Sequence, residues 1–209
     1  MNRVLLATQN PHKIKKLTWI VDGFFDSIEN LSDCNLKINI SENESSFKGN
    51  AETKVLTASK AVNGYAIATD GGVVIPALGD NWDALFTKRF SGEDSTDEVR
   101  IQLLLEMMKD KHGSDRSMFW REAIALAYRG QLLVSDEVEG VHGLLQDSFD
   151  PKKYTPGIWV CSVWYFPEIG KNFFDMTIKE QEYVEQSWHR LRKTIREYLK
   201  SNENHLPAD

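Results

Sequence analysis

The sequence predicts an α/β protein in which a mixed β-sheet is covered by helices, with two lobes and a cleft between them. Three observations support this fold class. Apolar strands alternate with helical patterns from Arg3 to Thr69, a long hairpin follows, and an amphipathic helical pattern closes the chain. Neither a repeat nor a long linker divides the sequence, so we expect residues 1–209 to form a single domain of two lobes.

The first predicted strand covers Arg3 to Thr8 and contains the apolar run Val4–Leu6. Asn10 and Pro11 end this strand, because proline lacks the N–H that a strand needs for pairing. A helical pattern follows, in which apolar side chains recur on one side. These side chains are Ile14, Leu17, Ile20 and Val21.

A second strand is predicted at Leu36 to Ile40, and a second helix at Phe47 to Val62. In the segment from Phe47 to Val62, apolar side chains recur at helical spacing, and Asn63–Gly64 is a typical helix end. Tyr65 to Thr69 then predicts a third strand, which we expect to end in the polar loop Thr69–Gly72.

Ligands of open α/β sheets usually bind beyond the carboxyl ends of strands. The first and third predicted strands both end in polar segments, Thr8–Lys13 and Thr69–Gly72. We therefore expect these two segments to face one another across the cleft.

The second half of the chain predicts a more antiparallel lobe. Met118–Tyr128 and Gln131–Val138 flank Arg129–Gly130 as a hairpin, and Gly157–Phe166 has the alternating aromatic pattern of another strand. A single long helix is predicted at the end of the chain, with His189, Arg192, Lys193 and Arg196 off its apolar stripe. The stripe consists of Val184, Trp188, Leu191, Ile195, Tyr198 and Leu199.

Composition excludes several classes of protein. The chain has 25 basic and 31 acidic residues, a net charge of −6, which disfavours broad binding to nucleic-acid phosphates. No apolar run approaches the roughly 20 residues of a membrane span or the core of a signal peptide. We therefore expect a cytoplasmic protein without nucleic-acid or membrane partners.

Cys34 and Cys161 match neither a disulfide framework nor a zinc site, so we expect reduced core thiols.

Two groups of polar residues are candidates for chemistry. Asn10 and Lys13 lie at a helix start, where N–H groups and an ammonium can bind phosphate oxygens. A helix cap and a solvated charge are the commoner roles of such residues. Asp70 follows an apolar strand and precedes two glycines, so a ligand or metal ion can approach it, although a turn aspartate has the same pattern. Either Glu42 or Glu44 could join Asp70 in holding Mg²⁺.

These residues belong to a series of motifs that resembles the inosine triphosphate pyrophosphatase family. Ala7–Lys13 resembles the family's opening motif, and Glu42 with Phe47, Asn50, Ala51 and Lys54 resembles its acidic loop and helix. Further resemblances follow in the same order along the chain. They are Ala68–Gly72, Ala77–Gly79, Phe86–Phe90, Arg116 with Phe119, Glu139–Leu145, Phe166–Met176 and Ser187–Arg190.

The resemblance implies a mixed, highly twisted central sheet flanked by helices, and a homodimer that splits non-standard purine nucleoside triphosphates into monophosphate and pyrophosphate. It implies that Glu42 and Asp70 hold Mg²⁺, that Asp70 activates the attacking water, and that Asn10 and Lys13 clamp the phosphates. The other substrate-binding residues that it implies are Thr8, Gly71, Lys88, Trp164, Phe166, Lys171, His189 and Arg190. For Trp164 and Phe166, core packing is the alternative role.

The chain departs from the family pattern at several positions. Lys16 and Thr69 stand where the family usually has acids, and Trp188 interrupts the serine-histidine-arginine motif. The family's base-recognition loop, with its Asp, has no counterpart around Gly157–Phe166, and neither does a Lys that the family carries before that motif. We therefore expect altered base specificity. The alternatives are a catalytically inactive descendant that binds nucleotides or a partner, and a hydrolase of another phosphate substrate.

Overall fold

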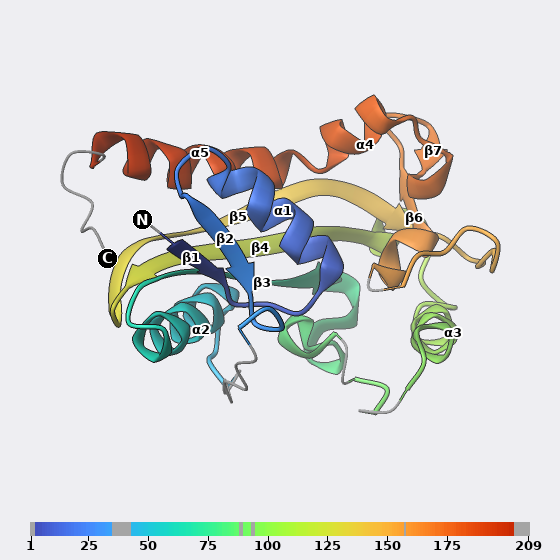
Figure 1. Cartoon of the computed structure of the whole chain (residues 1–209). Helices are drawn as coiled ribbons and strands as arrows, with labels where there is room; N and C mark the ends of the chain where they lie inside the picture. Colours follow the sequence, from blue (N-terminus) through green and yellow to red (C-terminus); the bar gives the residue numbers. More distant parts are fainter. Residues whose placement is uncertain (1–2, 35–42, 88–89, 93–94, 157, 203–209) are drawn as a thin grey trace. The chain divides into compact units, whose positions relative to one another are not determined.

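The computed structural model describes residues 3–34, 43–87, 90–92, 95–156 and 158–202 (Figure 1). The chain divides into two compact units. Unit 1 comprises Met1–Asp70, Glu122–Val138 and Ser187–Asp209, and unit 2 comprises Gly71–Arg121 and Glu139–Gln186. No helix in the described ranges has the length and apolarity to cross a membrane.

The described strands form one mixed sheet in the order β2-β1-β3-β4-β5-β6-β7. Strand β1 pairs in parallel with β2 and with β3, whereas β6 pairs antiparallel with β5 and with β7. The predicted α/β class with a mixed sheet is thus confirmed. The strands are β1 (Arg3–Leu6), β2 (Ser27–Asn30), β3 (Tyr65–Val74), β4 (Ser117–Tyr128), β5 (Gln131–Leu145), β6 (Trp164–Phe166) and β7 (Lys171–Asn172).

Helix α1 (Pro11–Val21) begins where the sequence predicts it. The Asn10 side chain caps the helix by accepting hydrogen bonds from the backbone N–H groups of His12 and Lys13. Pro11 lies in the first turn, where no helical hydrogen bond needs its missing N–H. The buried side chains of α1 are Leu17, Ile20 and Val21, which pack in the core of unit 1.

Helix α2 (Phe47–Ala61) covers the face of the sheet opposite to α1 (Figure 1). Ser46 caps its start by accepting a hydrogen bond from the Gly49 N–H. Asn63 follows the helix with φ of 49°, the left-handed conformation that ends helices. The predicted helix and its end signal are both confirmed.

Strand β3 corrects the prediction that the third strand ends at Thr69. It continues through Asp70, Gly71 and Gly72 to Val74. Ile67 is buried in the core of unit 1 and Val73 in the core of unit 2, so the burial of apolar residues on both sides keeps this polar segment extended. Asp70 therefore projects from a strand and not from a loop.

The hairpin of β4 and β5 is confirmed, and β5 continues beyond the predicted end at Val138. Arg129 and Gly130 have φ of 49° and 79°, the positive values that a two-residue hairpin turn favours. The Arg129 guanidinium lies 4.8 Å from the ring centre of Tyr128. Its Nε also donates a hydrogen bond to the Asn63 carbonyl at 3.1 Å.

Strand β2 was not predicted by the sequence pattern, because its four residues are all only half-buried and show no alternation. Its parallel partner β1 is buried from Val4 to Leu6 and provides the hydrogen-bonding edge. The predicted strand Leu36–Ile40 lies outside the described residues.

In unit 2, the predicted strand Gly157–Phe166 is wrong over most of its length. Trp159–Val163 is a 3₁₀ helix, and only Trp164–Phe166 forms a strand. The Ser162 hydroxyl donates a hydrogen bond to the Trp159 carbonyl at 2.6 Å, closing one helical turn. Trp159 and Val160 are neighbours in sequence and both buried, which is incompatible with the alternating burial of a half-buried strand.

Helix α3 (Asp97–Met107) packs against this core of unit 2 through Ile101 and Leu104. Thr96 caps it by accepting a hydrogen bond from the Val99 N–H. Asp97 in the first turn receives hydrogen bonds from Arg100 at 2.7 Å and from the Tyr154 hydroxyl. The loop that carries Tyr154 is thereby attached to the start of α3.

The single long helix predicted at the end of the chain is two helices, α4 (Ile178–Val184) and α5 (Gln186–Ser201). Thr177 and Glu180 start α4 with a reciprocal capping box. The apolar stripe divides at this break, because Val184 packs in the core of unit 2 and Trp188 in the core of unit 1. The periodicity of apolar residues continues across the break and so conceals it.

The basic residues predicted to lie off the α5 stripe do so, and two of them contact the end of α1. Arg192 Nε donates to the Trp19 carbonyl at 3.3 Å, and Arg196 Nη1 donates to the Asp22 carbonyl at 2.9 Å. The last turn of α1 has no basic residue of its own. The two guanidinium groups from α5 therefore stabilise the carbonyl end of α1.

Both cysteines are free, as predicted. Cys161 packs against the core of unit 2, and burial raises the pKa of its thiol. Cys34 is half-buried like Cys161, but it packs against neither core of the described residues, so its predicted place in a core is wrong. Its Sγ lies 3.0 Å from Glu29 Oε2, and burial together with this hydrogen bond raises the Cys34 pKa to about 11.

Candidate functional site

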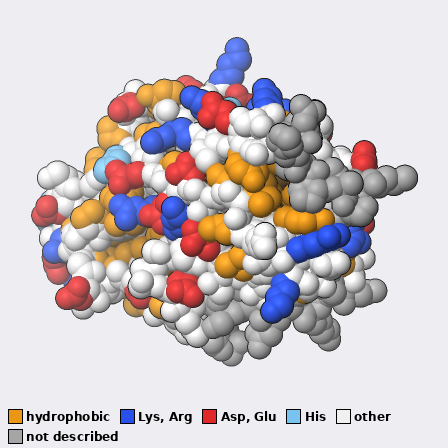
Figure 2. Space-filling view, turned by 90° about the vertical axis from the view of Figure 1, so that its left-hand side faces the viewer, with side chains coloured by type: hydrophobic (Ala, Val, Ile, Leu, Met, Phe, Trp, Pro, Cys, Tyr) orange, Lys and Arg blue, Asp and Glu red, His pale blue; other side chains and the backbone are white. Residues whose placement is uncertain are grey.

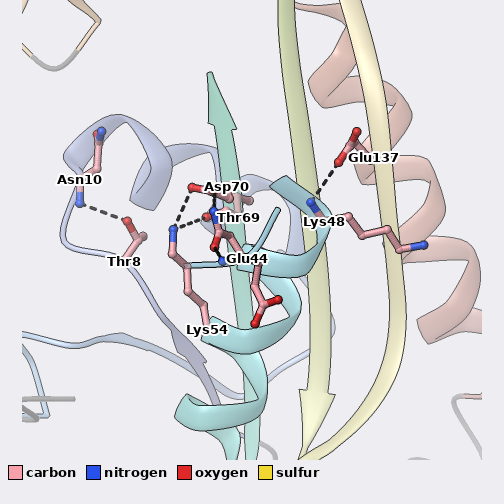
Figure 3. A network of polar contacts seen from close by, with 9 residues as sticks. Thr8, Asn10, Glu44, Lys48, Lys54, Thr69, Asp70 and Glu137 are labelled. Carbon is pink, nitrogen blue, oxygen red and sulfur yellow. Dashed lines mark hydrogen bonds and ion pairs between the residues drawn. The ribbon is translucent and has the colours of Figure 1, made fainter. Parts of the chain in front are cut away.

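The candidate site in unit 1 is centred on the Asp70 carboxylate, which α2 holds from one side (Figure 3). Lys54 Nζ lies 2.9 Å from Asp70 Oδ1, and Asn50 Nδ2 lies 2.9 Å from Asp70 Oδ2. The Lys54 and Asp70 side chains are 10% and 13% exposed, so little water screens this ion pair. The two contacts hold the carboxylate in one orientation.

Asn50 and Lys54 are functional candidates that the sequence analysis did not assign to the site. They lie one turn apart on α2, on its buried face beside Ala51 and Val55. Helical periodicity identifies that face as core, and it does not indicate which polar side chains on the face reach a neighbouring strand. One signal in the sequence could have identified them. Asn50 and Lys54 are four residues apart, so they lie on one face of the predicted helix, and the strand that follows this helix carries Asp70.

The segment after β1 is held by local hydrogen bonds. Thr8 Oγ1 accepts a hydrogen bond from the Asn10 N–H at 3.2 Å, and Asn10 Oδ1 accepts one from the His12 N–H at 2.9 Å. The cap alternative for Asn10 is therefore realised, and its phosphate-binding role stays a prediction. The Lys13 ammonium has no hydrogen bond or ion pair within the described part of the chain.

The acidic loop contributes Glu44, whereas Glu42 lies outside the described residues. The backbone N–H of Glu44 donates to Asn50 Oδ1 at 3.1 Å, and its carboxylate accepts a hydrogen bond from the Thr53 hydroxyl at 2.9 Å. Asn50 thus links the backbone of the acidic loop to the Asp70 carboxylate. Figure 3 shows Glu44 beside this network.

Of two other predicted substrate-binding residues, the structure describes Gly71 but not Lys88. Gly71 directly follows Asp70 within β3, so it belongs to a strand and not to the predicted loop. Lys88 lies outside the described residues. Their contacts with substrate stay predictions.

Trp164 and Phe166 lie in the core of unit 2, and each is 3% exposed. Their rings stack on each other, with centroids 5.2 Å apart and an interplanar angle of 17°. A nucleobase could stack on either ring only after displacing a core contact. The structure therefore favours the core-packing role over the predicted stacking on a base.

Lys171 of unit 2 forms an ion pair with the capping glutamate of α4. Its ammonium lies 2.8 Å from Glu180 Oε1 and 2.9 Å from Glu180 Oε2. The hydrogen bond from Lys171, followed by those from Thr177, lowers the Glu180 pKa to about 2 from its usual 4.5. Any contact of Lys171 with substrate has to compete with this pairing.

This lowered pKa predicts a pH-dependent stability. Because the folded state keeps Glu180 ionised below the pKa of the unfolded chain, its contribution is complete above about pH 4.5 and is lost as the pH falls toward 2. Glu180→Gln should therefore reduce the loss of melting temperature between about pH 6 and about pH 3. Thermal melts at both pH values measure this, with the exposed Glu182→Gln as the control. An equal loss in both variants would contradict the prediction.

His189 and Arg190 lie in the first turn of α5 and are exposed. The His189 ring meets the Trp19 ring edge-on, with centroids 4.9 Å apart. Their neighbours Ser187 and Trp188 are instead buried. In this motif, the residues that were predicted to contact the base are therefore the ones that reach solvent.

Charge on the surface is mixed in the view of Figure 2, where Lys and Arg side chains alternate with Asp and Glu. Hydrophobic side chains lie between them on the same face. In the described ranges, no three side chains of His, Cys, Asp or Glu converge as a metal site. A magnesium site needs only one or two protein carboxylates, because substrate phosphates and water complete it.

The family described as the Ham1 family matches residues 4–148. The chain belongs to the Ham1 family. This match includes Thr8, Asn10, Lys13, Asp70 and the helix that carries Asn50 and Lys54. It ends before the predicted base-binding residues Trp164, Phe166, Lys171, His189 and Arg190.

Relatives of this Ham1 chain include named enzymes. A dITP/XTP pyrophosphatase of Thermoanaerobacter sp. (strain X514) is 26% identical over 198 residues, covering 94% of this chain and 96% of the relative. A dITP/XTP pyrophosphatase of Bacillus subtilis (strain 168) is 30% identical over 142 residues, covering 67% and 71% respectively. The family resemblance of the sequence is thus confirmed.

A solved structure supports the Ham1 fold independently. The HAM1 protein from Coxiella burnetii superposes with a TM-score of 0.77 at 24% identity, covering 94% of this chain and 100% of that protein. At this level of identity the likeness shows the fold alone. It agrees with the mixed sheet and its flanking helices.

Proposed function

We propose that this Ham1 protein is a nucleoside triphosphate pyrophosphatase, which hydrolyses non-standard purine nucleoside triphosphates to monophosphate and pyrophosphate. The observation that carries the proposal is the Asp70 carboxylate, which projects from within β3 and is held by Asn50 and Lys54. Relatives named dITP/XTP pyrophosphatase support the reaction class. We propose that the protein acts in the cytoplasm. On the family resemblance, we also propose that it forms a homodimer.

The residues after β1 suit the phosphate tail of the substrate. The Lys13 ammonium, which has no polar partner among the described residues, and the remaining N–H groups at the start of α1 attract negatively charged oxygens. Thr8 and Asn10 hold this segment in shape through their side-chain oxygens. Phosphoryl transfer depends mainly on such positioning and on neutralising charge.

Asp70 is the proposed general base. Its carboxylate orients a water molecule and accepts its proton as the water oxygen bonds to the α-phosphorus. The bond from the α-phosphorus to the bridging oxygen breaks, and pyrophosphate leaves. Asn50 keeps the carboxylate in one orientation during this step. Asp70 and the glutamates of the acidic loop, Glu42 or Glu44, are oxygen donors of the kind that Mg²⁺ prefers. The donor set therefore fits the ion. When bound there, Mg²⁺ supplies charge neutralisation at the phosphates.

The base end of the substrate is proposed to meet His189 and Arg190. Lys88 and Lys171 are the further cations proposed for the substrate. Without the family's recognition Asp and Lys, fewer polar groups can distinguish a six-position oxygen from an amino group. We therefore propose altered base specificity, with a weaker preference for ITP over ATP or GTP than in typical relatives.

The proposed function is tested by measuring pyrophosphate release from purine and pyrimidine triphosphates, with and without Mg²⁺. We expect Mg²⁺-dependent release and a kcat/KM for ITP that exceeds that for ATP by less than about a thousandfold, or ~4 kcal/mol. His189→Ala and Arg190→Ala should lower the remaining preference. Absence of release from every triphosphate would support the inactive descendant, and a larger preference would show that other contacts read the base.

Lys13 gives a second test through binding. Lys13→Ala should weaken the binding of a non-hydrolysable triphosphate at least about tenfold and leave nucleoside binding unchanged, because the ammonium meets only the phosphates. Isothermal titration calorimetry measures the affinity of the protein for the triphosphate and for the nucleoside. Lys15→Ala is the matched control, since Lys15 is an exposed lysine on the same helix. Equal losses for triphosphate and nucleoside would place Lys13 elsewhere.

A further inference from the structure

The role of Lys54 rests on the proposed function of Asp70. Both oxygens of the Asp70 carboxylate already have donors, Lys54 Nζ on Oδ1 and Asn50 Nδ2 on Oδ2, each at 2.9 Å. Lys54 Nζ also lies 3.5 Å from the Thr69 carbonyl oxygen. Two oxygens of β3, one from the Thr69 backbone and one from the Asp70 side chain, thus hold the ammonium against the carboxylate (Figure 3).

This pairing conflicts with metal binding at the same carboxylate. A divalent cation that ligates Asp70 Oδ1 has to share one negative charge with an ammonium that is already in contact with that oxygen. The two side chains are 10% and 13% exposed, so water screens the repulsion between the two cations poorly. The ammonium has to move before the carboxylate can ligate a metal ion strongly.

We propose that Lys54 competes with a divalent cation for Asp70, and so prevents strong metal binding until nucleotide is present. The phosphate oxygens of a bound nucleotide offer the ammonium a second anionic partner. Lys54 then leaves Asp70 Oδ1, and the carboxylate becomes available as a metal ligand. Lys54 is thereby a positioning residue that makes metal binding depend on nucleotide.

Lys48 provides a matched control for Lys54. Both lysines belong to α2, and removal of either changes the charge of the protein equally. The Lys48 side chain is exposed, and Figure 3 shows its ammonium pointing away from Asp70. The Lys48 backbone N–H donates a hydrogen bond to Glu137 Oε2 at 2.9 Å.

The experiment measures metal affinity without nucleotide, by calorimetry with Mg²⁺ and by electron paramagnetic resonance with Mn²⁺. Lys54→Met should bind both ions at least about tenfold more tightly than the unaltered protein, and Lys48→Met within about twofold of it. Lys54→Gln should also bind more tightly, because it keeps an amide donor for Asp70 but removes the charge. Added Mg²⁺ should raise the melting temperature of Lys54→Met more than that of the unaltered protein.

Two results would overturn the proposal. One is a Lys54→Gln or Lys54→Met protein that binds Mn²⁺ no more tightly than Lys48→Met. The other is micromolar Mg²⁺ binding by the unaltered protein without nucleotide, which needs no variant to fold.

The failure of this proposal is distinguishable from failure of the proposed function, because the titrations require no turnover. If the unaltered protein releases pyrophosphate but the Lys54 variants bind metal no more tightly, only the competition is wrong. If the variants bind more tightly but the unaltered protein hydrolyses no nucleotide, only the pyrophosphatase activity is wrong.

Discussion

Replacing Asp70 by Asn is expected to lower the turnover of nucleoside triphosphates by a factor of about a hundred or more. The amide has nearly the shape of the carboxylate, but it cannot accept a proton from water and is a weak ligand for Mg²⁺. It also leaves the Lys54 ammonium without the carboxylate that it contacts at 2.9 Å. The rate of pyrophosphate release under saturating substrate and metal measures the loss of turnover.

This experiment needs a stability control, because removing one partner of a shielded ion pair is destabilising. Circular dichroism melts define a temperature at which Asp70→Asn is folded, and turnover is compared there. Asp80→Asn is the matched variant, since Asp80 is an exposed aspartate of unit 2. Unchanged turnover in a folded Asp70→Asn protein would remove Asp70 from the mechanism.

The parts of the fold that the sequence predicts are those with local chemical signals. Asn10 before Pro11 starts α1, Asn63 ends α2, and Arg129–Gly130 forms the hairpin turn. Each signal acts through the backbone of its own few residues, by capping or by a positive φ. Such features form in the same way whatever the rest of the chain packs against.

The errors arise where packing decides the structure. Gly71 and Gly72 are typical of a loop, yet β3 passes through them because Ile67 and Val73 are buried in different cores. The apolar stripe of the terminal helices continues through Glu185, yet the helices separate there because α4 begins and ends with its own caps. No local pattern in the sequence reports which core a side chain enters.

The candidate site shows the same limit. Asp70 and Lys13 are recognisable in the sequence because each has a distinctive neighbourhood along the chain. Asn50 and Lys54 lie on a helix face whose other residues are buried, so their periodicity indicates core. Only the packing of α2 beside β3 brings them to Asp70, at 2.9 Å each.

Replacing Gly143 by Ala is expected to destabilise the protein by about 3 kcal/mol, which lowers its melting temperature by roughly 6–12 °C. A Cβ at this position of β5 would lie 2.2 Å from Trp164 Nε1 and 2.7 Å from the Tyr165 carbonyl oxygen. Trp164 cannot easily rotate away, because it stacks on Phe166 at 5.2 Å and lies beside Trp120 at 6.1 Å. Thermal or denaturant unfolding measures the loss.

A double-mutant cycle separates the contribution of the indole ring from that of the backbone. Trp164→Leu removes the indole nitrogen, so adding Gly143→Ala to it should cost less than adding Gly143→Ala to the unaltered protein. The cost should not vanish, because the Tyr165 carbonyl remains close to the new Cβ. A melting temperature of Gly143→Ala equal to that of the unaltered protein would show that β5 and β6 separate easily here. In that case Trp164 could leave its core contacts, and the predicted stacking of this ring on a nucleobase would regain support over core packing.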